Sequence, residues 1–424
     1  MLVFKFGGAS VKDASAVKNV AQIISLFPTK KKLVVVSAMG KTTNALEEIV
    51  DALSTNNYES YRYLVEEIIK YHLKIVDNLF LERHEGLVTF LDDMKEFLFE
   101  KIKKPFSEKY DYEYDQIVSL GEVISTKIVE AYLLDRTVSA IWIDTKQFIR
   151  TDNNYRNAFV DWKKTQELID LNLRPLFKTS DVIVTQGFIG ATAEGFATTL
   201  GREGSDYSAG IFAYCLDAES VTIWKDVPGM LNADPKWFDK TIKLNQISFQ
   251  EAIELAYYGA TVIHPKTIKP LQNKNIPLYV KSFVDPSASG TVISSITDYD
   301  HLVPSFIFKM NQIKVGITPK DFSFIVEENL SHLFNILSTS GVQINLMQNS
   351  AISFDFVIEN KPSVIKNLFS QLESDFIVTI EEGLELVTIR HYDQATIDRV
   401  TIDKEIILTQ KSKQTARILM RNIK

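Results

Sequence analysis

The sequence predicts an α/β protein, with an open, mostly parallel sheet sandwiched between helices and a ferredoxin-like region towards the C-terminus. Apolar runs such as Leu33–Val36 lack the alternation of a half-exposed strand, which is typical of strands buried on both faces of a parallel sheet. Each run leads through a small polar loop into a helical pattern, and this order recurs along the chain. Beyond a polar stretch at residues 294–300 the order becomes β-α-β-β-α-β. We therefore expect two domains, residues 1–298 and 299–424.

The N-terminal segments follow the order strand, loop, helix. Gly7 and Gly8 break the first strand, and Ser10 with Asp13 resembles a capping box that opens a helix. The expected elements are a strand at 2–6, a helix from 10 to about 26, a strand at 33–36, a polar loop at 37–44 and a helix at 45–53.

A helical segment is expected at about residues 58–135, because apolar side chains recur there at spacings of three to five. Leu87–Ile102 and Asp115–Leu134 show this pattern, and a strand follows at Val138–Ile143. Gly121 lies inside the second of these helices. A glycine in a helix interior costs about 1 kcal/mol relative to alanine, which favours a close approach by a neighbouring segment.

The middle of the chain repeats the pattern around a glycine-containing loop at residues 198–206. Gly201 and Gly204 let the backbone approach a ligand closely, and Ser205 is expected to cap the helix behind them. The expected elements are a strand at 182–185, a glycine-rich turn at 187–195, helices at 207–214, 248–258 and from 265, and strands at 221–224 and within 276–283.

The C-terminal region reads as a ferredoxin-like unit followed by additional strands. The expected elements are strands at 306–317, 342–348, 351–358, 376–380 and 384–391, helices at 328–338 and 362–372, and a terminal hairpin at 405–421.

Composition limits the class of protein. A hydrophobic content of 45% is enough for large buried cores, and a formal net charge of −7 argues against nucleic-acid or anionic-membrane partners. The single cysteine, Cys215, excludes an internal disulfide framework and fits a reducing compartment. No apolar run approaches the roughly 18 residues of a membrane span, and the N-terminus leads straight into a strand. We expect a cytoplasmic protein.

Three glycine-containing loops that follow strands carry cations or hydroxyl groups: residues 5–8, 37–44 and 198–206. Because loops after parallel strands meet at one edge of the sheet, Lys5 is expected to face Arg202 across a cleft lined with backbone amides. Such a cleft suits a polyphosphate. The loops contain no Gly-x-x-x-x-Gly-Lys-Ser/Thr motif, which excludes a P-loop enzyme.

No histidine and carboxylate cluster suggests a metal cage, so we assign no metal ligand. The isolated histidines, which are more often structural than catalytic, are His264, His301, His332 and His391.

These motifs together resemble the amino acid kinase family and, within it, the aspartate kinases. The resemblance runs in register over about residues 2–293, and the tail resembles the ACT regulatory region of that family, with a second ACT unit that is degenerate. The motifs that carry it are Lys5-Phe6-Gly7-Gly8-Ala9-Ser10, Val35–Gly40 with Thr43-Asn44, Ser119–Glu122, Gly187–Gly190, Thr199–Tyr207, Asp226–Gly229, Asp234-Pro235, Gly259-Ala260 and His264-Pro265.

The resemblance implies ATP-dependent phosphorylation of the β-carboxylate of L-aspartate to 4-phospho-L-aspartate, the first step of lysine, threonine and methionine synthesis. A side-chain carboxylate with a pKa near about 3.9 is already ionised at neutral pH, so this nucleophile needs no general base. The difficulty is to bring one anion against the terminal phosphate of another, which positioning and cations can overcome. Mg²⁺ would arrive with ATP, held mainly by phosphates and water.

By the same resemblance, each motif residue receives a role. Lys5 stabilises the transferring phosphoryl group and Asp206 orients Lys5 and the substrate. The residues implied in aspartate binding are Thr43, Glu122 (on the α-ammonium), Arg202 (on a carboxylate) and Ser205, and those on the nucleotide side are Gly7, Gly8, Ser10, Ser37, Lys225, Asp226, Leu231, Asp234 and Lys236. For Thr43 and Ser37, helix capping is an alternative to ligand contact.

Several positions depart from the family pattern. Glu203 stands where a third glycine is usual, Lys225 replaces a threonine, Leu231 replaces a tyrosine, and Thr261 stands where many members have a nucleotide-contacting lysine. Lys225, Lys266 or Lys269 could supply that missing charge.

The departures leave two other functions open: another amino acid kinase, such as a glutamate or acetylglutamate kinase, or a catalytically impaired amino-acid-binding regulator. In the tail, the loop from Phe322 lacks the family's Gly-Phe turn, and Asn345 stands where lysine-sensitive members often have aspartate, so lysine or threonine feedback stays open. Because exposed strand edges seek partners, a homodimer or higher homo-oligomer through the tail is expected.

Overall fold

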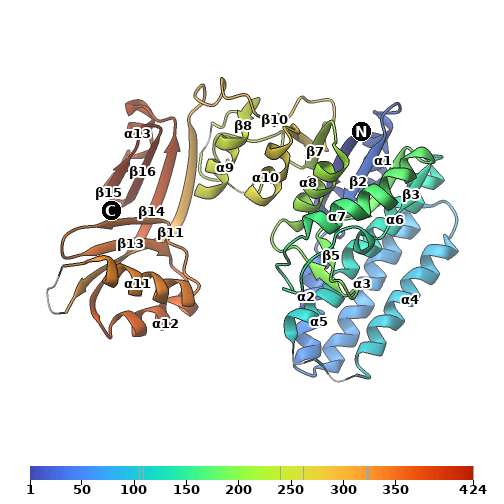
Figure 1. Ribbon diagram of the computed structural model, residues 1–424, viewed down its shortest axis with the longest axis horizontal. Coiled ribbons are helices and arrows are strands. Elements are labelled where there is room, and N and C mark those ends of the chain that lie inside the picture. Colours follow the sequence, from blue (N-terminus) through green and yellow to red (C-terminus); the bar gives the residue numbers. More distant parts are fainter. Residues whose placement is uncertain (105, 108, 239, 261, 321–323, 424) are drawn as a thin grey trace. The chain divides into compact units, whose positions relative to one another are not determined.

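The computed structural model describes residues 1–424 apart from 105, 108, 239, 261, 321–323 and 424 (Figure 1). The chain forms two compact units. The first comprises Met1–Met230, Lys243–Ile253 and Thr261–Tyr299, and the second comprises Leu231–Ile242, Glu254–Ala260 and Asp300–Lys424. The polar stretch at 294–300 lies at the last crossing between them, and two short earlier segments also fall in the second unit.

The first unit contains an eight-stranded sheet in the order β3-β4-β2-β1-β7-β9-β10-β8. Among the described strand pairs of this sheet, only β9 and β10 run antiparallel. The predicted α/β class with a mostly parallel sheet is therefore confirmed. The strands are β1 Leu2–Phe6, β2 Lys32–Val36, β3 Ala140–Trp142, β4 Val182–Gln186, β7 Ser220–Lys225, β8 Gln246–Ser248, β9 Leu278–Ser282 and β10 Thr291–Ser294.

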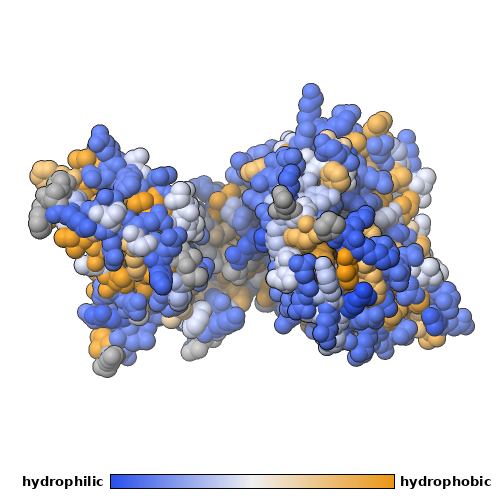
Figure 2. Space-filling model, turned by 90° about the horizontal axis from the view of Figure 1, so that it is seen from below, coloured by the Kyte–Doolittle hydropathy of each residue, from blue (hydrophilic) through white to orange (hydrophobic). Residues whose placement is uncertain are grey.

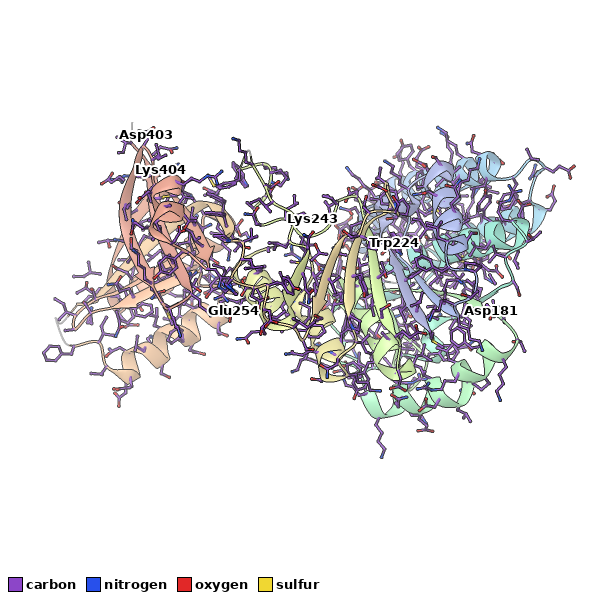
Figure 3. The ribbon with its side chains drawn as sticks, turned by 90° about the horizontal axis from the view of Figure 1, so that it is seen from above. Asp181, Trp224, Lys243, Glu254, Asp403 and Lys404 are labelled. Carbon is purple, nitrogen blue, oxygen red and sulfur yellow. The ribbon has the colours of Figure 1, made fainter. Side chains whose placement is uncertain are left out.

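The register of the central strands sets which loops meet at one sheet edge. Phe6 in β1 pairs with Val36 in β2 and with Trp224 in β7, and Val36 pairs with Gln186 in β4. These residues lie at the carboxyl ends of four neighbouring parallel strands. The loops that follow β1, β2, β4 and β7 consequently begin side by side, and Figure 3 labels Trp224 at this edge.

Helices cover both faces of this sheet. Side chains at Phe4, Phe6, Val34 and Val36 point to one face and join an apolar core, together with residues of α1 to α6. Lys5 points to the other face, as the period of two in a strand requires, and reaches helix α8. Alternation along β1 thus separates the structural core from the polar side chain that is expected to do chemistry.

The helices of the first unit include the predicted helical segment, in which α3 and α4 lie side by side (Figure 1). A small hairpin, β5 Ile189–Ala191 with β6 Ala197–Thr199, follows β4. The helices up to residue 273 are α1 Ala14–Ser25, α2 Thr42–Ser54, α3 Tyr58–Leu79, α4 Glu85–Lys101, α5 Tyr110–Val118, α6 Leu120–Asp135, α7 Trp162–Leu168, α8 Gly204–Leu216, α9 Phe249–Tyr258 and α10 Pro265–Asn273, with short turns η1 Gly8–Val11, η2 Thr145–Gln147, η3 Ile169–Leu173 and η4 Arg174–Lys178.

Three local predictions are corrected by the structure. Helix α1 begins after Asp13, whose carboxylate accepts the N–H of Ala16 at 2.8 Å, whereas Ser10 lies in η1 and donates to the carbonyl of Trp224 at 3.3 Å. The helix predicted over 115–134 is interrupted at Ser119, giving α5 and α6. The turn predicted at 187–195 contains β5 of the hairpin, and α7 was not predicted.

His72 in α3 offers a test of the core of the first unit. The ring is fully buried, its Nδ1 lies 2.8 Å from the Ile68 carbonyl oxygen, and its Nε2 has no hydrogen-bond partner among the described residues. Burial lowers the pKa of His72 to about 4. The unfolded chain takes up a proton near pH 6.5 and the folded one does not, so this residue removes stability as pH falls from 6.5 to 4.

We therefore expect the Tm of the wild type to fall further than that of His72→Leu between pH 7.5 and pH 5. The change of Tm with pH is compared between the two proteins, so the cost of the altered packing at position 72 cancels. Parallel decline of the two proteins, followed by calorimetry, would contradict the buried neutral imidazole.

The second unit contains a six-stranded sheet in the order β12-β13-β11-β14-β16-β15, with antiparallel pairs. The order β12-β13-β11-β14, with α11 and α12, is the ferredoxin-like arrangement predicted for this region. The elements are β11 Ser305–Pro319, α11 Glu327–Thr339, β12 Leu346–Asn349, β13 Phe354–Glu359, α12 Pro362–Leu372, β14 Phe376–Arg390, α13 Gln394–Val400, β15 Lys404–Lys411 and β16 Thr415–Asn422.

The long strands β11 and β14 run through both halves of this sheet, the half with β12 and β13 and the half with β15 and β16. The strands predicted at 376–380 and 384–391 are one continuous strand, β14, because it pairs with β11 on both sides of a bulge near Gln312. The second half adds β15, β16 and one helix, α13, which was not predicted. The start of the loop predicted to lack a Gly-Phe turn, Phe322, lies outside the described residues.

The surface is mostly hydrophilic on the face that Figure 2 shows, with scattered hydrophobic residues. Among the described residues, no helix combines the length and the apolar character needed to cross a lipid bilayer.

Candidate active site

A cavity of about 550 Å³ opens where the loops after β1, β2, β4 and β7 meet in the first unit. We call it the loop cavity. It brings together residues that lie more than two hundred positions apart in the sequence, from Lys5 to Lys225. Its lining comprises Lys5, Gly8, Ser37, Ala38, Gly40, Thr43, Glu47, Tyr114, Glu122, Arg156, Phe188, Gly201, Arg202, Glu203, Gly204, Ser205, Asp206 and Lys225.

Lys5 and Arg202 line the same cavity, as predicted, although the Arg202 turn follows the antiparallel hairpin β5–β6 and not a strand of the parallel sheet. Lys5 comes from β1 and is almost buried, whereas Arg202 lies exposed in the loop before α8. One cation is therefore fixed inside the cavity and the other stands at its mouth.

Asp206 holds two ammonium groups at the base of the cavity. Its Oδ1 lies 2.6 Å from Nζ of Lys5, and its Oδ2 lies 3.5 Å from Nζ of Lys225. Burial alone would raise the pKa of Asp206, but the two lysines outweigh it and keep the pKa below its ordinary value. Asp206 is thus a carboxylate that positions two cations.

Lys225 has a second partner, the carbonyl oxygen of Val262. It is the lysine that stands in place of a threonine in the sequence pattern, and it lies inside the loop cavity. The other two lysines considered for the missing charge lie elsewhere: Lys266 donates to Asn157 at 2.6 Å, and Lys269 is exposed outside the cavity lining. Thr261 lies outside the described residues.

Glu122 is a buried carboxylate at the start of α6. Its Oε1 accepts the N–H of Ala38 at 3.2 Å, and its buried Oε2 has no hydrogen-bond partner among the described residues. Burial raises the pKa of Glu122 to about 8, against the opposing influence of the Ala38 N–H and of Lys5. An unpaired buried carboxylate facing a cavity is suited to a cationic ligand group.

This pKa gives a prediction about stability. The unfolded carboxyl group ionises near pH 4.5 and the folded one near pH 8, so the wild type loses stability as pH rises through that window. Glu122→Gln has no such loss. We expect the Tm of the variant relative to the wild type to increase from pH 5 to pH 8, measured by calorimetry without substrates; a constant difference would show that Glu122 ionises normally.

Close contacts with the loop after β2 explain two glycines, Gly8 and Gly121. A Cβ at Gly8 would lie 2.8 Å from the Ala38 carbonyl oxygen and 2.9 Å from that of Gly40, so a side chain here would push the loops after β1 and β2 apart. A Cβ at Gly121 would lie 2.9 Å from Cβ of Ala38, which is the close approach predicted for a glycine inside a helix.

The loop before α8 differs from its prediction in one respect. Residue Glu203, at φ 54°, is the N-cap of α8, and Ser205 lies within the helix without capping it. The left-handed backbone at Glu203 disfavours a side chain, which fits the glycine usual at this position. Burial raises the pKa of Glu203, and its Oε2 has no hydrogen-bond partner among the described residues.

Three further residues line the cavity that sequence patterns did not single out. Tyr114 donates to Glu47 at 2.6 Å, and the guanidinium of Arg156 lies 4.4 Å from the centre of the Tyr114 ring. Arg156 also pairs with Asp111 at 3.2 Å. The sequence does not predict Tyr114 as a cavity residue, because an aromatic side chain in a helical pattern is equally typical of the apolar core.

Only some of the residues predicted on the nucleotide side line the loop cavity, whereas all those predicted to bind aspartate do. The loop cavity is lined by Ser37, Gly8 and Lys225, but not by Gly7 or Ser10. The Ser10 hydroxyl donates to the Trp224 carbonyl. Asp226 is exposed just after β7, and Leu231, Asp234 and Lys236 belong to the second unit.

The carboxylates of the loop cavity do not form a metal cage. Within the described part of the chain, no three or more His, Cys, Asp or Glu side chains gather in a way that could hold a metal ion. Asp206 is taken up by two ammonium groups, while Glu203 keeps a buried oxygen without a partner. This donor set fits a cation that brings most of its ligands with it.

Comparisons with known proteins identify the family. Residues 1–282 match the model of the amino acid kinase family. Lysine-sensitive aspartokinase 3 of Escherichia coli is 30% identical over 404 residues, which cover 92% of this chain and 86% of that protein. Chloroplastic aspartokinase 1 of Arabidopsis thaliana is 31% identical over 401 residues, covering 91% of this chain and 68% of that protein.

The structure is also similar to solved aspartokinases. E. coli aspartokinase III in complex with lysine and aspartate superimposes with a TM-score of 0.79 at 28% identity, covering 99% of this chain and 95% of that one. The same enzyme in complex with aspartate and ADP gives a TM-score of 0.79 at 27% identity, covering 99% and 96%. The family model and the aspartokinases that match over more than 90% of this chain agree with the mostly parallel sheet and with the loop cavity around Lys5 and Asp206, so the chain belongs to the amino acid kinase family and, within it, to the aspartokinases.

Proposed function

We propose that the loop cavity transfers the terminal phosphoryl group of ATP to the β-carboxylate of L-aspartate, giving 4-phospho-L-aspartate. The observation that carries this proposal is that one cavity contains both a buried cation and a buried carboxylate oxygen without a partner among the described residues. The cation is Lys5, held by Asp206, and the oxygen is Oε2 of Glu122. An amino acid with two carboxylates needs both a counter-charge for its ammonium and cations for its anionic groups. The similar enzyme solved with aspartate and ADP supports the same pair of ligands.

Aspartate would bind through charge complementarity. Glu122 would receive the α-ammonium, which supplies the counter-charge that its buried Oε2 lacks. Arg202 would hold a carboxylate at the mouth with its planar donor fork. Thr43, half-buried at the start of α2, and Ser205 line the cavity and can donate hydroxyl groups.

The phosphoryl group would meet Lys5. Its ammonium, fixed by Asp206, would face charge that develops on the transferring phosphoryl oxygens, and Lys225 would add a second positive charge from the same anchor. The backbone N–H of Gly8 and the hydroxyl group of Ser37 would donate to phosphate, while the Ser37 N–H donates to the Phe6 carbonyl at 3.0 Å. The aspartate carboxylate is already ionised, so no side chain has to remove a proton.

ATP would bring Mg²⁺ with it, held mainly by phosphates and water, and the ion would neutralise phosphate charge. Glu203 is the carboxylate of the glycine loop that could accept a hydrogen bond from metal-bound water, because its Oε2 is otherwise unpartnered among the described residues. Asp226, Leu231, Asp234 and Lys236 keep their place on the nucleotide side as part of this proposal.

A substrate panel with hydroxylamine trapping tests the proposal. With Mg-ATP we expect a hydroxamate from L-aspartate and none from L-glutamate or N-acetyl-L-glutamate. Formation from glutamate alone would make the chain a different amino acid kinase. No turnover with any acceptor would instead favour a catalytically impaired regulator, the function to which Glu203 and Lys225 lend some support.

We also propose a homo-oligomer formed through the second unit. Strands β12 and β15 are the two edges of its sheet, so each presents backbone groups that a second copy can pair with. The biosynthetic setting, the cytoplasmic location and feedback by lysine or threonine belong to this proposal as well. Light scattering of the full chain checks the oligomer.

A further inference from the structure

Arg156 adds a cation to the lining of the loop cavity, and the proposed phosphoryl transfer gives it no role. Lys5 and Lys225, in the same lining, are both held by Asp206. Arg156 is instead an exposed residue, as is Arg202 at the mouth of the cavity. The position and the partners of Arg156 therefore indicate what this further cation binds.

The backbone of Arg156 is held in a conformation that arginine rarely adopts. Its φ is 65°, in the left-handed region that disfavours a side chain. The Arg156 N–H donates to Oδ2 of Asp115 at 2.9 Å, and this fully buried carboxylate also accepts the N–H and the hydroxyl of Thr199 at 2.9 and 2.7 Å. Such strain persists where the surrounding contacts impose it, and it gathers at ligand sites.

The side chain of Arg156 is placed on a fixed aromatic ring. Its guanidinium lies 4.4 Å from the centre of the Tyr114 ring, which is buried and whose hydroxyl donates to Glu47 at 2.6 Å. Among the described residues, only Nη1 of the guanidinium has a hydrogen-bond partner, Asp111 at 3.2 Å. The two side chains of that pair are 48% and 59% exposed, and exposed ion pairs contribute little. A stronger acceptor inside the cavity can take the place of Asp111.

A backbone contact brings the segment of Arg156 against the loop that carries Arg202. A Cβ at Gly201 would lie 3.3 Å from the Arg156 carbonyl oxygen and 2.8 Å from Oδ1 of Asn157. Glycine at position 201 therefore allows the two segments to pack directly together, and both arginines line the loop cavity. Guanidinium groups match a carboxylate through paired N–H donors, so one carboxylate can be held by both.

We propose that Arg156 is a second substrate-binding arginine, which holds the α-carboxylate of L-aspartate together with Arg202. The identity of this substrate rests on the proposed function. In that function the β-carboxylate meets Lys5 and the ammonium meets Glu122, so the α-carboxylate is the charged group that remains for the arginines. Arg156 thereby sets a preference for acceptors whose α-carboxylate is charged over acceptors in which this group is neutral.

Calorimetry without ATP tests the proposal. The probes are L-aspartate and, as its competitor, L-isoasparagine, in which a neutral amide replaces the α-carboxylate. We expect the preference for L-aspartate, the ratio of the two dissociation constants, to fall by about tenfold in Arg156→Gln. A merely structural role would weaken both ligands alike, so an unchanged ratio overturns the proposal. Absence of L-aspartate binding by the wild type overturns it as well.

Two further variants separate binding from structure. Glycine adopts a φ of 65° freely, so Arg156→Gly should fold, and we expect it to lower the preference as Arg156→Gln does. Asp111→Asn removes the exposed partner of Arg156 and frees its guanidinium, so the affinity for L-aspartate should be kept or increased. If the ion pair itself were what matters, both of its sides would be needed. Equal losses of affinity in Asp111→Asn and Arg156→Gln would therefore contradict the proposal.

Arg136 provides the matched control outside the loop cavity. Its guanidinium lies 5.9 Å from the centre of the Tyr132 ring, and it pairs with Asp135 at 3.4 Å. Arg136→Gln thus removes the same two kinds of contact, an aromatic ring and an exposed carboxylate. We expect this variant to bind both probes as the wild type does, and a matching fall in preference would show that the effect at position 156 is not specific.

Kinetics separates this inference from the proposed function. In Arg156→Gln we expect the KM for L-aspartate to rise by about tenfold, with kcat and the KM for ATP little changed, because the contact is made before and during the transfer. If the chain shows the expected change in preference but transfers no phosphoryl group, the proposed function is wrong and Arg156 keeps its role. Normal turnover with an unchanged preference in Arg156→Gln has the opposite meaning.

Discussion

Replacing Lys5 by methionine is expected to lower kcat by about 10³-fold, with the KM values for ATP and aspartate little changed. The methionine keeps the length of the side chain and removes the positive charge that Asp206 holds at 2.6 Å inside the loop cavity. Because this charge is needed most when the phosphoryl group is in transit, its loss appears in kcat. Steady-state kinetics with coupled detection of ADP provide the measurement.

The fold should survive this change. Lys225 remains within 3.5 Å of the other oxygen of Asp206, so the buried carboxylate keeps a counter-charge. Lys30→Met is the matched control, since Lys30 also pairs with a carboxylate, Glu219, at 2.6 Å but lies exposed at the surface. An undiminished kcat in Lys5→Met would remove the central cation from the mechanism.

Replacing Asp206 by asparagine is expected to lower kcat by about 10²-fold or more and to lower the Tm. Asparagine keeps the shape of the side chain but removes the negative charge that positions Lys5 and Lys225. The two ammonium groups then repel each other in a buried site, and breaking such a pair costs about 3–5 kcal/mol. Kinetics and calorimetry on the same preparation separate the loss of positioning from the loss of folded protein.

Helix α8 supplies its own control for this experiment. Asp217, at the C-terminal end of α8, pairs with Arg174 at 2.7 Å and with Lys274 at 2.5 Å, and its side chain is 60% exposed. Asp217→Asn therefore removes an aspartate that holds two cations at the surface, where ion pairs contribute only about 0–1 kcal/mol. We expect normal kcat in this variant; equal losses at positions 206 and 217 would mean that Asp206 is merely structural.

Much of the fold could be predicted because local signals agreed with the tertiary structure. Leu33–Val36 is buried on both faces, and double glycine ends β1 at the sheet edge. The hairpin β5–β6 could not be predicted in the same way, because its strands are only three residues long and sit among glycines. Leu231–Ile242 belongs to the second unit because Phe238 packs against Phe306, and no local sequence pattern predicts that contact.

The candidate site could be predicted where its residues lie in loops after parallel strands. Lys5 lies near the end of β1, Arg202 lies in the turn after the antiparallel hairpin β5–β6, and Asp206 lies in the first turn of α8; all three line the loop cavity. Tyr114 and Arg156 were missed because they enter from a helix and from an irregular segment, where their type fits a surface or core position equally well. The nucleotide-side role of Ser10 is implied only by the resemblance of its motif, and no sequence pattern indicates that its hydroxyl donates to the Trp224 carbonyl at 3.3 Å.

The central claim is that two anionic reactants meet between Lys5, Glu122 and Arg202 in the loop cavity. A crystal structure of the chain with ADP and L-aspartate tests it most directly. The account predicts aspartate with its ammonium on Glu122, a carboxylate on Arg202, and its β-carboxylate turned to Lys5 and the terminal phosphate of ADP. Aspartate bound away from this cavity, or with Glu122 and Lys5 facing no ligand, would contradict it.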